Sequence, residues 1–153
     1  YDYFFKIGEE FNLKPGSPNL IERIEGGLLS YGNDMDIGDN PFECGFDKYV
    51  NLESDIVFLG KEKLKKIKKE GIKRKLMGVK IEGKRIDLEE EIKMFNNENK
   101  EIGSLRSAGF SPRFNKIVGI AMVDKGFWEI SQKFKINING NNIHGEICSL
   151  PIL

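Results

Sequence analysis

Arg23 and Glu25 lie two residues apart on one predicted helix and are the first side chains whose types and spacing suggest chemistry. Positions two apart on a helix point in different directions, so these two groups need separate partners if they are buried. A buried guanidinium requires a carboxylate, several carbonyl oxygens or a ligand anion beside it. Arg23 is therefore predicted either to hold its helix in place through a salt bridge, which is the favoured alternative, or to contact a ligand.

An acidic loop follows this helix and contains four polar side chains, Tyr31, Asn33, Asp34 and Asp36. Two carboxylates in one loop could bind a metal or act as acid and base. However, the loop lacks the distal glutamate of a calcium loop, and aspartate beside glycine is common in turns. We interpret the aspartates as turn residues and predict neither a metal site nor a catalytic residue here.

The helix that positions these groups is predicted to run from Pro18 to Tyr31. Ser17 is a good N-cap, and proline suits the first helical position. Gly32 marks the predicted end. Apolar residues recur on one face, at Ile21, Ile24 and Leu28.

Three further segments precede the C-terminal half. Residues 1–12 are predicted as an amphipathic helix. Residues 41–50 are predicted as a short extended stretch, and Lys61–Glu70 as a lysine-rich helix ended by Gly71. The apolar side chains that the first helix would offer to a core are Phe4, Phe5, Ile7 and Phe11.

The C-terminal half has the pattern of a small antiparallel barrel, jelly-roll-like, of about six strands. Clusters of turn-forming residues separate the apolar runs, for example Asn97-Glu98-Asn99 and Asn139-Gly140-Asn141. The fold class is therefore α+β. Strands are predicted near 75–82, 89–96, 101–110, 116–123, 133–138 and 142–150.

Composition limits the possible functions. The 153 residues are 39% hydrophobic, enough for a core, and 24 basic residues balance 24 acidic ones. A net charge of zero gives no field that would attract nucleic acid or an anionic membrane, so neither is expected as a partner. Cys44 and Cys148 lack metal or redox spacing and are predicted to be reduced thiols. Without a membrane span or signal peptide in the sequence, we expect a cytoplasmic protein.

Four short motifs occur in order along the chain, the first of them in two parts. Residues 18–36 read PNLIERIEGGLLSYGNDMD, and residues 40–46 read NPFECGF. FLGKEKL follows at 58–64, RKLMGV at 74–79 and SAGFSP at 107–112. These resemble R-L-E-A-G, Y-G-x-D, T-P-x-E-A-G, F-I-G-(K/R)-E-A-L, R-(K/R)-L-V-G-L and S-G-T-F-S-P of the glycine-cleavage T-protein (aminomethyltransferase) family.

The resemblance implies tetrahydrofolate as cofactor and a C-terminal barrel domain at residues 53–153 with a leading helix. Residues 1–52 would be the C-terminal remnant of the α/β folate-binding domain, whose larger part would precede this chain and be its partner. The residues implied to contact the cofactor are Asn19, Arg23 and Tyr31. Glu43 matches the family glutamate and is predicted to be buried and bonded to backbone.

One departure from the family pattern concerns Asn19. T proteins usually carry A-R-D-x-L-R here, and this chain keeps only the second arginine, as Arg23. The form PNLIER is similar to dimethylsulfoniopropionate demethylases, which share the fold and folate but take a methyl group from a sulfonium. An amide at position 19 could hydrogen-bond folate without offsetting a carboxylate's charge, or could cap the helix.

The predicted function is transfer of a methyl group from a small sulfonium substrate to N5 of tetrahydrofolate. A first alternative is aminomethyl transfer from a lipoylated carrier protein, which the basic run at 61–75 could dock, although a solvated helix face explains that run more simply. A second alternative is a chain that is inactive when isolated and serves only as a barrel that packs on a partner or forms a homodimer. Arg106 and Arg113, which flank the last motif, could reach across to the folate-binding region.

Overall fold

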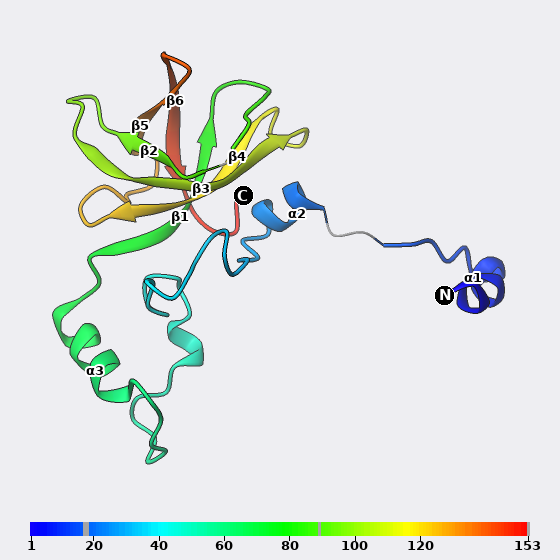
Figure 1. Cartoon of the computed structure of the whole chain (residues 1–153), viewed down its shortest axis with the longest axis horizontal. Helices are drawn as coiled ribbons and strands as arrows, with labels where there is room; N and C mark the ends of the chain where they lie inside the picture. The colour runs from blue at the N-terminus through cyan, green and yellow to red at the C-terminus, as the bar shows by residue number, and fades with distance from the viewer. Residues whose placement is uncertain (17–18, 89, 153) are drawn as a thin grey trace.

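A closed six-stranded antiparallel barrel dominates the computed structural model, which describes residues 1–16, 19–88 and 90–152 (Figure 1). The strand order around the barrel is β1-β4-β3-β2-β5-β6, and β6 pairs back onto β1. This confirms the α+β class and the predicted barrel. The strands are β1 (Arg74–Ile81), β2 (Ile92–Phe95), β3 (Glu101–Ser111), β4 (Lys116–Asp124), β5 (Lys133–Ile138) and β6 (Asn141–Cys148).

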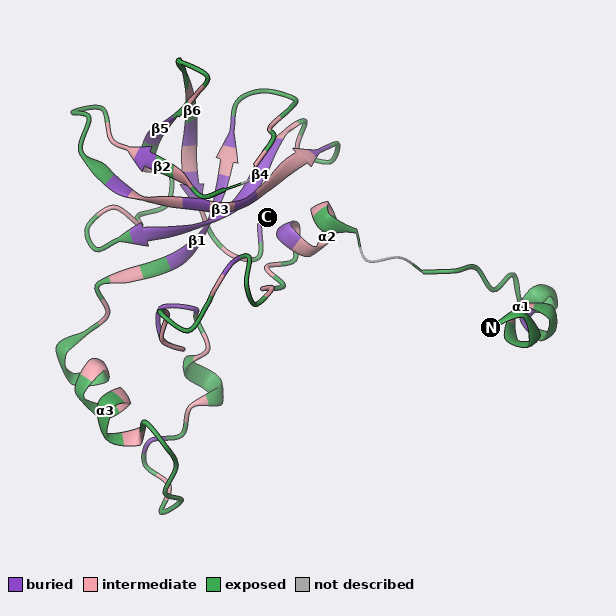
Figure 2. Ribbon diagram, viewed as in Figure 1, coloured by how far each residue is buried: buried purple, intermediate pink, exposed green. Residues whose placement is uncertain are grey.

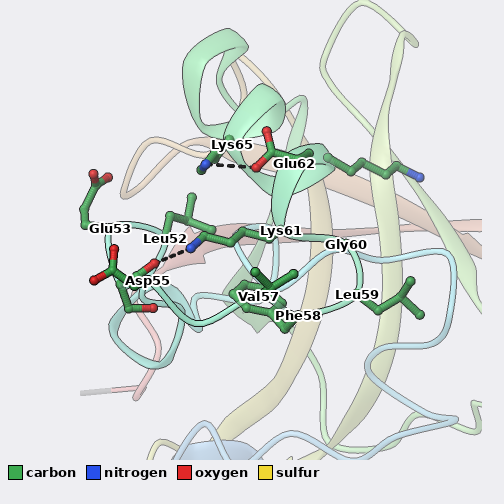
Figure 3. A pocket seen from close by; sticks show the side chains of 12 residues that line it. Leu52, Glu53, Asp55, Val57, Phe58, Leu59, Gly60, Lys61, Glu62 and Lys65 are labelled. Atoms are coloured by element: carbon green, nitrogen blue, oxygen red, sulfur yellow. Dashed lines mark hydrogen bonds and ion pairs between the residues drawn. The ribbon is translucent and has the colours of Figure 1, made fainter.

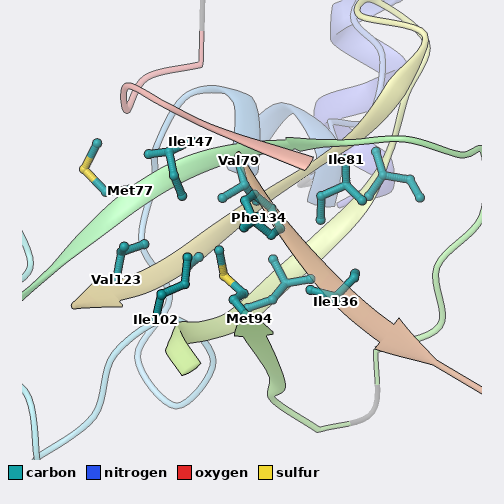
Figure 4. Packing of buried hydrophobic residues seen from close by; sticks show 12 residues of the cluster. Met77, Val79, Ile81, Met94, Ile102, Val123, Phe134, Ile136 and Ile147 are labelled. Carbon is teal, nitrogen blue, oxygen red and sulfur yellow. The ribbon is translucent and has the colours of Figure 1, made fainter. Parts of the chain in front are cut away.

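Alternate side chains of every strand fill the barrel interior, because successive residues of a strand point to opposite faces (Figure 4). Phe134 is the largest fully buried side chain among the described residues. The closed barrel therefore has a continuous apolar core of its own. The other core side chains labelled in Figure 4 are Met77, Val79, Ile81, Met94, Ile102, Val123, Ile136 and Ile147.

A second apolar cluster covers the outer face of the barrel. Strand β4 is buried on both faces, as the purple ribbon in Figure 2 shows, so it reads as an almost continuous apolar run. Its outward side chains Val118, Ile120 and Met122 pack with Ile24 and Ile152. The segments before and after the barrel thus share one core with its outer wall.

The helix that carries Arg23 is α2 (Leu20–Glu25), so the predicted span from Pro18 to Tyr31 is wrong at its C-terminal end. The helix stops because Gly27 adopts a left-handed conformation (φ 65°). The Leu28 N–H then donates to the Arg23 carbonyl at 2.9 Å, as in a Schellman motif. The expected cap at Ser17 and Pro18 lies outside the described residues.

Asn19 forms the N-cap of α2. Its Oδ1 accepts a hydrogen bond from the Ile21 N–H at 2.9 Å, which satisfies one of the free donors at the helix start. The local-cap alternative for this residue therefore has a direct structural basis.

The N-terminal segment forms α1 (Asp2–Gly8) and a short 3-10 helix, η1 (Glu9–Phe11). The expectation that its aromatic residues feed a core is wrong for this chain, since Phe4 is 73% and Phe11 76% exposed. The two short helices pack on each other and lie apart from the barrel (Figure 1), so the apolar core of the barrel does not cover their aromatic side chains.

The segment predicted as extended at 41–50 instead contains turns and the 3-10 helix η2 (Asp47–Tyr49). The reason is local: the Asn40 Oδ1 accepts from the N–H groups of Phe42 (3.1 Å) and Glu43 (3.2 Å), which starts a turn. Helix α3 (Lys61–Glu70) is as predicted, with its lysines mostly solvated. In the described part of the chain, no helix has both the length and the apolar character needed to cross a bilayer.

Candidate functional site at the junction of α2 and the barrel

The outer face of β3 is where α2 meets the barrel. A bulge between Leu105 and Ser107 resets the alternation of the strand. Beyond it, Ser107, Gly109 and Ser111 lie two residues apart and share one face toward α2. These three positions belong to the SAGFSP motif, and each receives a different side chain of the helix.

Arg23 binds three groups of its own chain. Its Nη1 donates to the Asp34 Oδ2 at 2.5 Å and to the Leu28 carbonyl at 2.9 Å, and its Nη2 lies 3.3 Å from the Ser107 Oγ. The Asp34 side chain is completely buried, and its Oδ2 also accepts from the Ser30 N–H at 2.6 Å. This arrangement agrees with the salt-bridge alternative: the arginine ties the helix to the loop and to β3.

Asp34 has a second oxygen, Oδ1, that is buried and has no hydrogen-bond partner among the described residues. Asp36 behaves as predicted for a turn residue, because its Oδ1 accepts from the Gly38 N–H at 2.6 Å. The two aspartates of the loop therefore have different structural roles, one in a buried ion pair and one in a turn.

Glu25 attaches the other end of α2. The Ser111 Oγ donates to the Glu25 Oε1 at 2.6 Å, and Arg113 lies 3.7 Å from the Oε2. Between these two attachments the Ile21 side chain lies over Gly109, where an added Cβ would be 2.3 Å from the Ile21 Cδ1. Glycine at position 109 therefore leaves room for the end of this side chain.

A second ion network fixes the loop that follows. Arg106, with a side chain only 7% exposed, donates from Nη1 to the Asp39 Oδ2 at 2.6 Å and to the Asp34 carbonyl at 2.8 Å. Arg74 reaches the Asp39 Oδ1 at 2.8 Å and the Glu43 Oε2 at 3.4 Å. Arg106 is thus used within the chain rather than extended toward another domain, and Glu43 is buried as predicted, with the Asn40 N–H at 3.2 Å.

The carboxyl group of Asp39 has a lowered pKa in this network. Burial acts to raise it, but the hydrogen bond from Arg106, a backbone hydrogen bond at Asp36 and the charges of Arg106 and Arg74 outweigh that effect. Asp39 is therefore ionised at neutral pH and links the loop electrostatically to two strands of the barrel.

The three residues predicted to contact folate have different environments. Asn19 is exposed at the start of α2, Tyr31 is 70% exposed, and Arg23 is occupied by its ion pair. Asn19 and Tyr31 thus leave an amide and a phenol exposed, whereas the Arg23 guanidinium ties α2 to the loop and to β3. Their contact with the cofactor stays a prediction.

Asp39, Ser107 and Ser111 are the residues of this junction that sequence reasoning missed. The spacing of Ser107, Gly109 and Ser111 was the available signal, since small residues two apart on a strand mark a face that another backbone approaches. Asp39 gave no such signal, because its arginine partner lies 67 residues away. No group of three or more His, Cys, Asp or Glu able to hold a metal occurs in the described ranges.

Comparison with known proteins identifies the family of this chain. The glycine cleavage T-protein C-terminal barrel domain matches residues 74–153, a little over half of the chain. Dimethylsulfoniopropionate demethylase DmdA of Ruegeria pomeroyi is 36% identical over 128 residues, and an aminomethyltransferase of Thermosipho melanesiensis is 40% identical over 129 residues. Each match covers 84% of this chain, which spans 34% of the length of either relative.

The solved structure of the glycine cleavage system aminomethyltransferase T from Bartonella henselae superimposes with a TM-score of 0.77 at 25% sequence identity. The match covers 86% of this chain and 37% of that one. The barrel and the segments packed on it therefore have the same arrangement in both proteins. The chain belongs to the glycine cleavage T-protein family.

Proposed function

We propose that this chain is the C-terminal part of a tetrahydrofolate-dependent one-carbon transferase that demethylates a small sulfonium compound such as dimethylsulfoniopropionate. The observation that carries the proposal is Asn19, a neutral and exposed N-cap at the position where the T-protein motif has an arginine. The relative named dimethylsulfoniopropionate demethylase supports this substrate class. Sequence identity alone does not, since an aminomethyltransferase reaches 40%.

Bound tetrahydrofolate would supply N5 as the nucleophile that takes the methyl group, with methylthiopropionate as the leaving thioether. The residues of this chain act by orientation. Asn19 offers an amide and Tyr31 a phenol to the cofactor. Arg23 and Glu25 hold their helix against Ser107 and Ser111, so that the exposed ends of the segment keep one geometry.

The proposal assigns residues 1–52 to a folate-binding domain and residues 53–153 to the barrel domain with its leading helix. The partner of the chain would be the larger N-terminal folate-binding region that the relatives' lengths imply. Residues of α2 belong to the first part but pack on the second, so the two parts share the outer apolar cluster around Ile24.

Aminomethyl transfer from a lipoylated carrier protein is the second candidate. Two observations favour it: several relatives are named aminomethyltransferase, and α3 presents six lysines, most of them exposed, that could dock an acidic carrier. A neutral Asn19 argues against it.

The test uses the complete reading frame that contains these residues, incubated with tetrahydrofolate and dimethylsulfoniopropionate. We expect 5-methyltetrahydrofolate, detected by mass spectrometry, and we expect Asn19→Arg to reduce its formation more than Asn19→Asp, which keeps the N-cap. Turnover only with an aminomethyl-lipoyl carrier would establish the second candidate. Absence of both activities would favour a chain that serves as an interaction module, which packs on a partner or forms a homodimer.

A further inference from the structure

Exposed large apolar side chains are distributed very unevenly over this chain. Of those found among the described residues, all except Ile130 lie before α3, in residues 1–59. The barrel itself exposes almost none, because its interior and the outer wall of β4 are covered. Exposed apolar residues that gather in one segment mark a candidate site of interaction, so the segments before α3 that carry them are candidate contact surfaces.

One such segment is the docking loop, residues 54–59. Val57 is 91% exposed and Leu59 is fully exposed, and Ile56 is exposed as well. The loop lines a groove of about 820 Å³ together with Leu52 and the first turn of α3 (Figure 3).

The docking loop is held in shape by polar contacts to its backbone. The Lys61 ammonium group donates to the Ile56 carbonyl at 3.1 Å and also to the Ser54 carbonyl. The Asn51 Oδ1 accepts from the N–H groups of Glu53 (3.1 Å) and Ser54 (3.2 Å). A loop ordered in advance loses little conformational entropy on binding, which favours a specific contact over loose adhesion.

The family relationship indicates what covers the loop. This chain spans 34% of the length of two relatives, and the matching domain is the C-terminal one, so most of each relative precedes the matching segment. The exposed apolar residues precede the barrel in the sequence, and the N-terminal region of the relatives would connect to the chain at that same end. A second copy of this chain would not account for the asymmetry as directly.

We propose that the docking loop at 54–59 binds the folded region that precedes this segment in its relatives, with Val57 and Leu59 as the anchoring side chains and Lys61 as the residue that positions the loop. The inference rests on the proposed function only in naming that partner. It assigns a role to two residues of the FLGKEKL motif. Leu59 contacts the partner, and Lys61 orders the loop through the Ile56 carbonyl.

Hydroxyl-radical footprinting read by mass spectrometry tests this without substrate or tetrahydrofolate. In the 153-residue chain, Val57 and Leu59 are expected to be labelled strongly. In the complete reading frame their labelling is expected to fall to the level of the buried Ile24, while the exposed Ile130 stays labelled in both. Equal labelling of Val57 and Leu59 in the two proteins would overturn the proposal, and so would protection in the isolated chain that rises with its concentration, which indicates a second copy.

A matched pair of variants in the complete protein provides a second readout. Val57→Asp places a charge in the proposed contact, and we expect labelling of Leu59 to return. Ile130→Asp places the same charge on an exposed apolar position of the barrel and should leave Leu59 protected. Because neither experiment measures turnover, a failed activity test and a failed docking test are distinguishable.

Discussion

Two arginines converge on Asp39, and it joins a loop to two strands of the barrel. Its side chain is 1% exposed and that of Arg106 is 7% exposed, so without Asp39 the Arg106 charge would stay buried, with only the half-exposed Glu91 as its carboxylate partner at 3.3 Å. Removing one partner of a buried ion pair typically costs about 3–5 kcal/mol, because the remaining charge stays buried. This junction is therefore sensitive to the loss of either partner.

We predict that Asp39→Asn lowers the free energy of unfolding at neutral pH by about 3–5 kcal/mol. The folded-state pKa of Asp39 lies below that of the unfolded chain, about 3.9, so the stabilisation is present above that value. This stabilisation is lost as the pH falls through the folded-state pKa, and the free energies of unfolding of the wild type and of Asp39→Asn should become equal there. Urea unfolding measured from pH 7 down to acid pH checks this. The matched control is Asp87→Asn, which removes an exposed ion pair with Arg85 and should change the stability little. A stability difference between the wild type and Asp39→Asn that does not change with pH would contradict the ionised, paired state of Asp39.

The two thiols give a second prediction at this scale. Burial, as the largest cause, raises the pKa of both Cys44 and Cys148 to about 11. Because the thiolate is the nucleophile, both should react slowly with iodoacetamide at pH 8 in the folded chain and rapidly after unfolding. Alkylation followed by peptide mass spectrometry measures this. Fast labelling of either cysteine without loss of structure would show that its thiol is not buried as described.

At the scale of elements, Gly109 leaves room for the Ile21 side chain where α2 lies on β3. We predict that Gly109→Ala loosens this attachment by about 1 kcal/mol, the low end of the cost of overpacking, because the new Cβ would displace only the terminal Cδ1 of Ile21, now 2.3 Å away. Hydrogen exchange of the α2 amides should become faster. Adding Ile21→Ala should restore part of the protection, since it removes the clashing atom. Gly16→Ala, at a position with nothing within 4 Å, is the control and should have no such effect.

Strand positions were predictable from this sequence to within a few residues, and so were both ends of α3, whereas the C-terminal end of α2 was not. Alternating apolar residues and turns such as Asn139-Gly140 determine strands locally. The end of α2 was missed because Leu28 continues the apolar spacing although Gly27 adopts a left-handed conformation and stops the helix. The role of Arg106 could not be predicted, since its partner Asp39 becomes adjacent only when the barrel has formed.

At the scale of the whole molecule, stability is concentrated in the barrel and its outer apolar cluster. We predict that deleting residues 1–16 leaves the midpoint of thermal unfolding unchanged, because α1 and η1 pack on each other and lie apart from the barrel. Differential scanning calorimetry of the two chains measures this. A lower midpoint in the shortened chain would mean that the N-terminal helices contribute to the barrel after all. Replacing Ile24 with Ala is the contrasting variant, and its loss of a fully buried side chain should cost about 2–5 kcal/mol.

The closure of the barrel by β6 on β1 also determines when this domain can form during synthesis. Gly78 to Ile81 of β1 pair with Gly145 to Cys148 of β6, so the sheet stays open until almost the last residues of the barrel have been made. Until then the nascent chain carries two unpaired strand edges and an uncovered apolar interior, the features that favour misassembly and chaperone binding. Any region made earlier would already have left the ribosome while the barrel was still open.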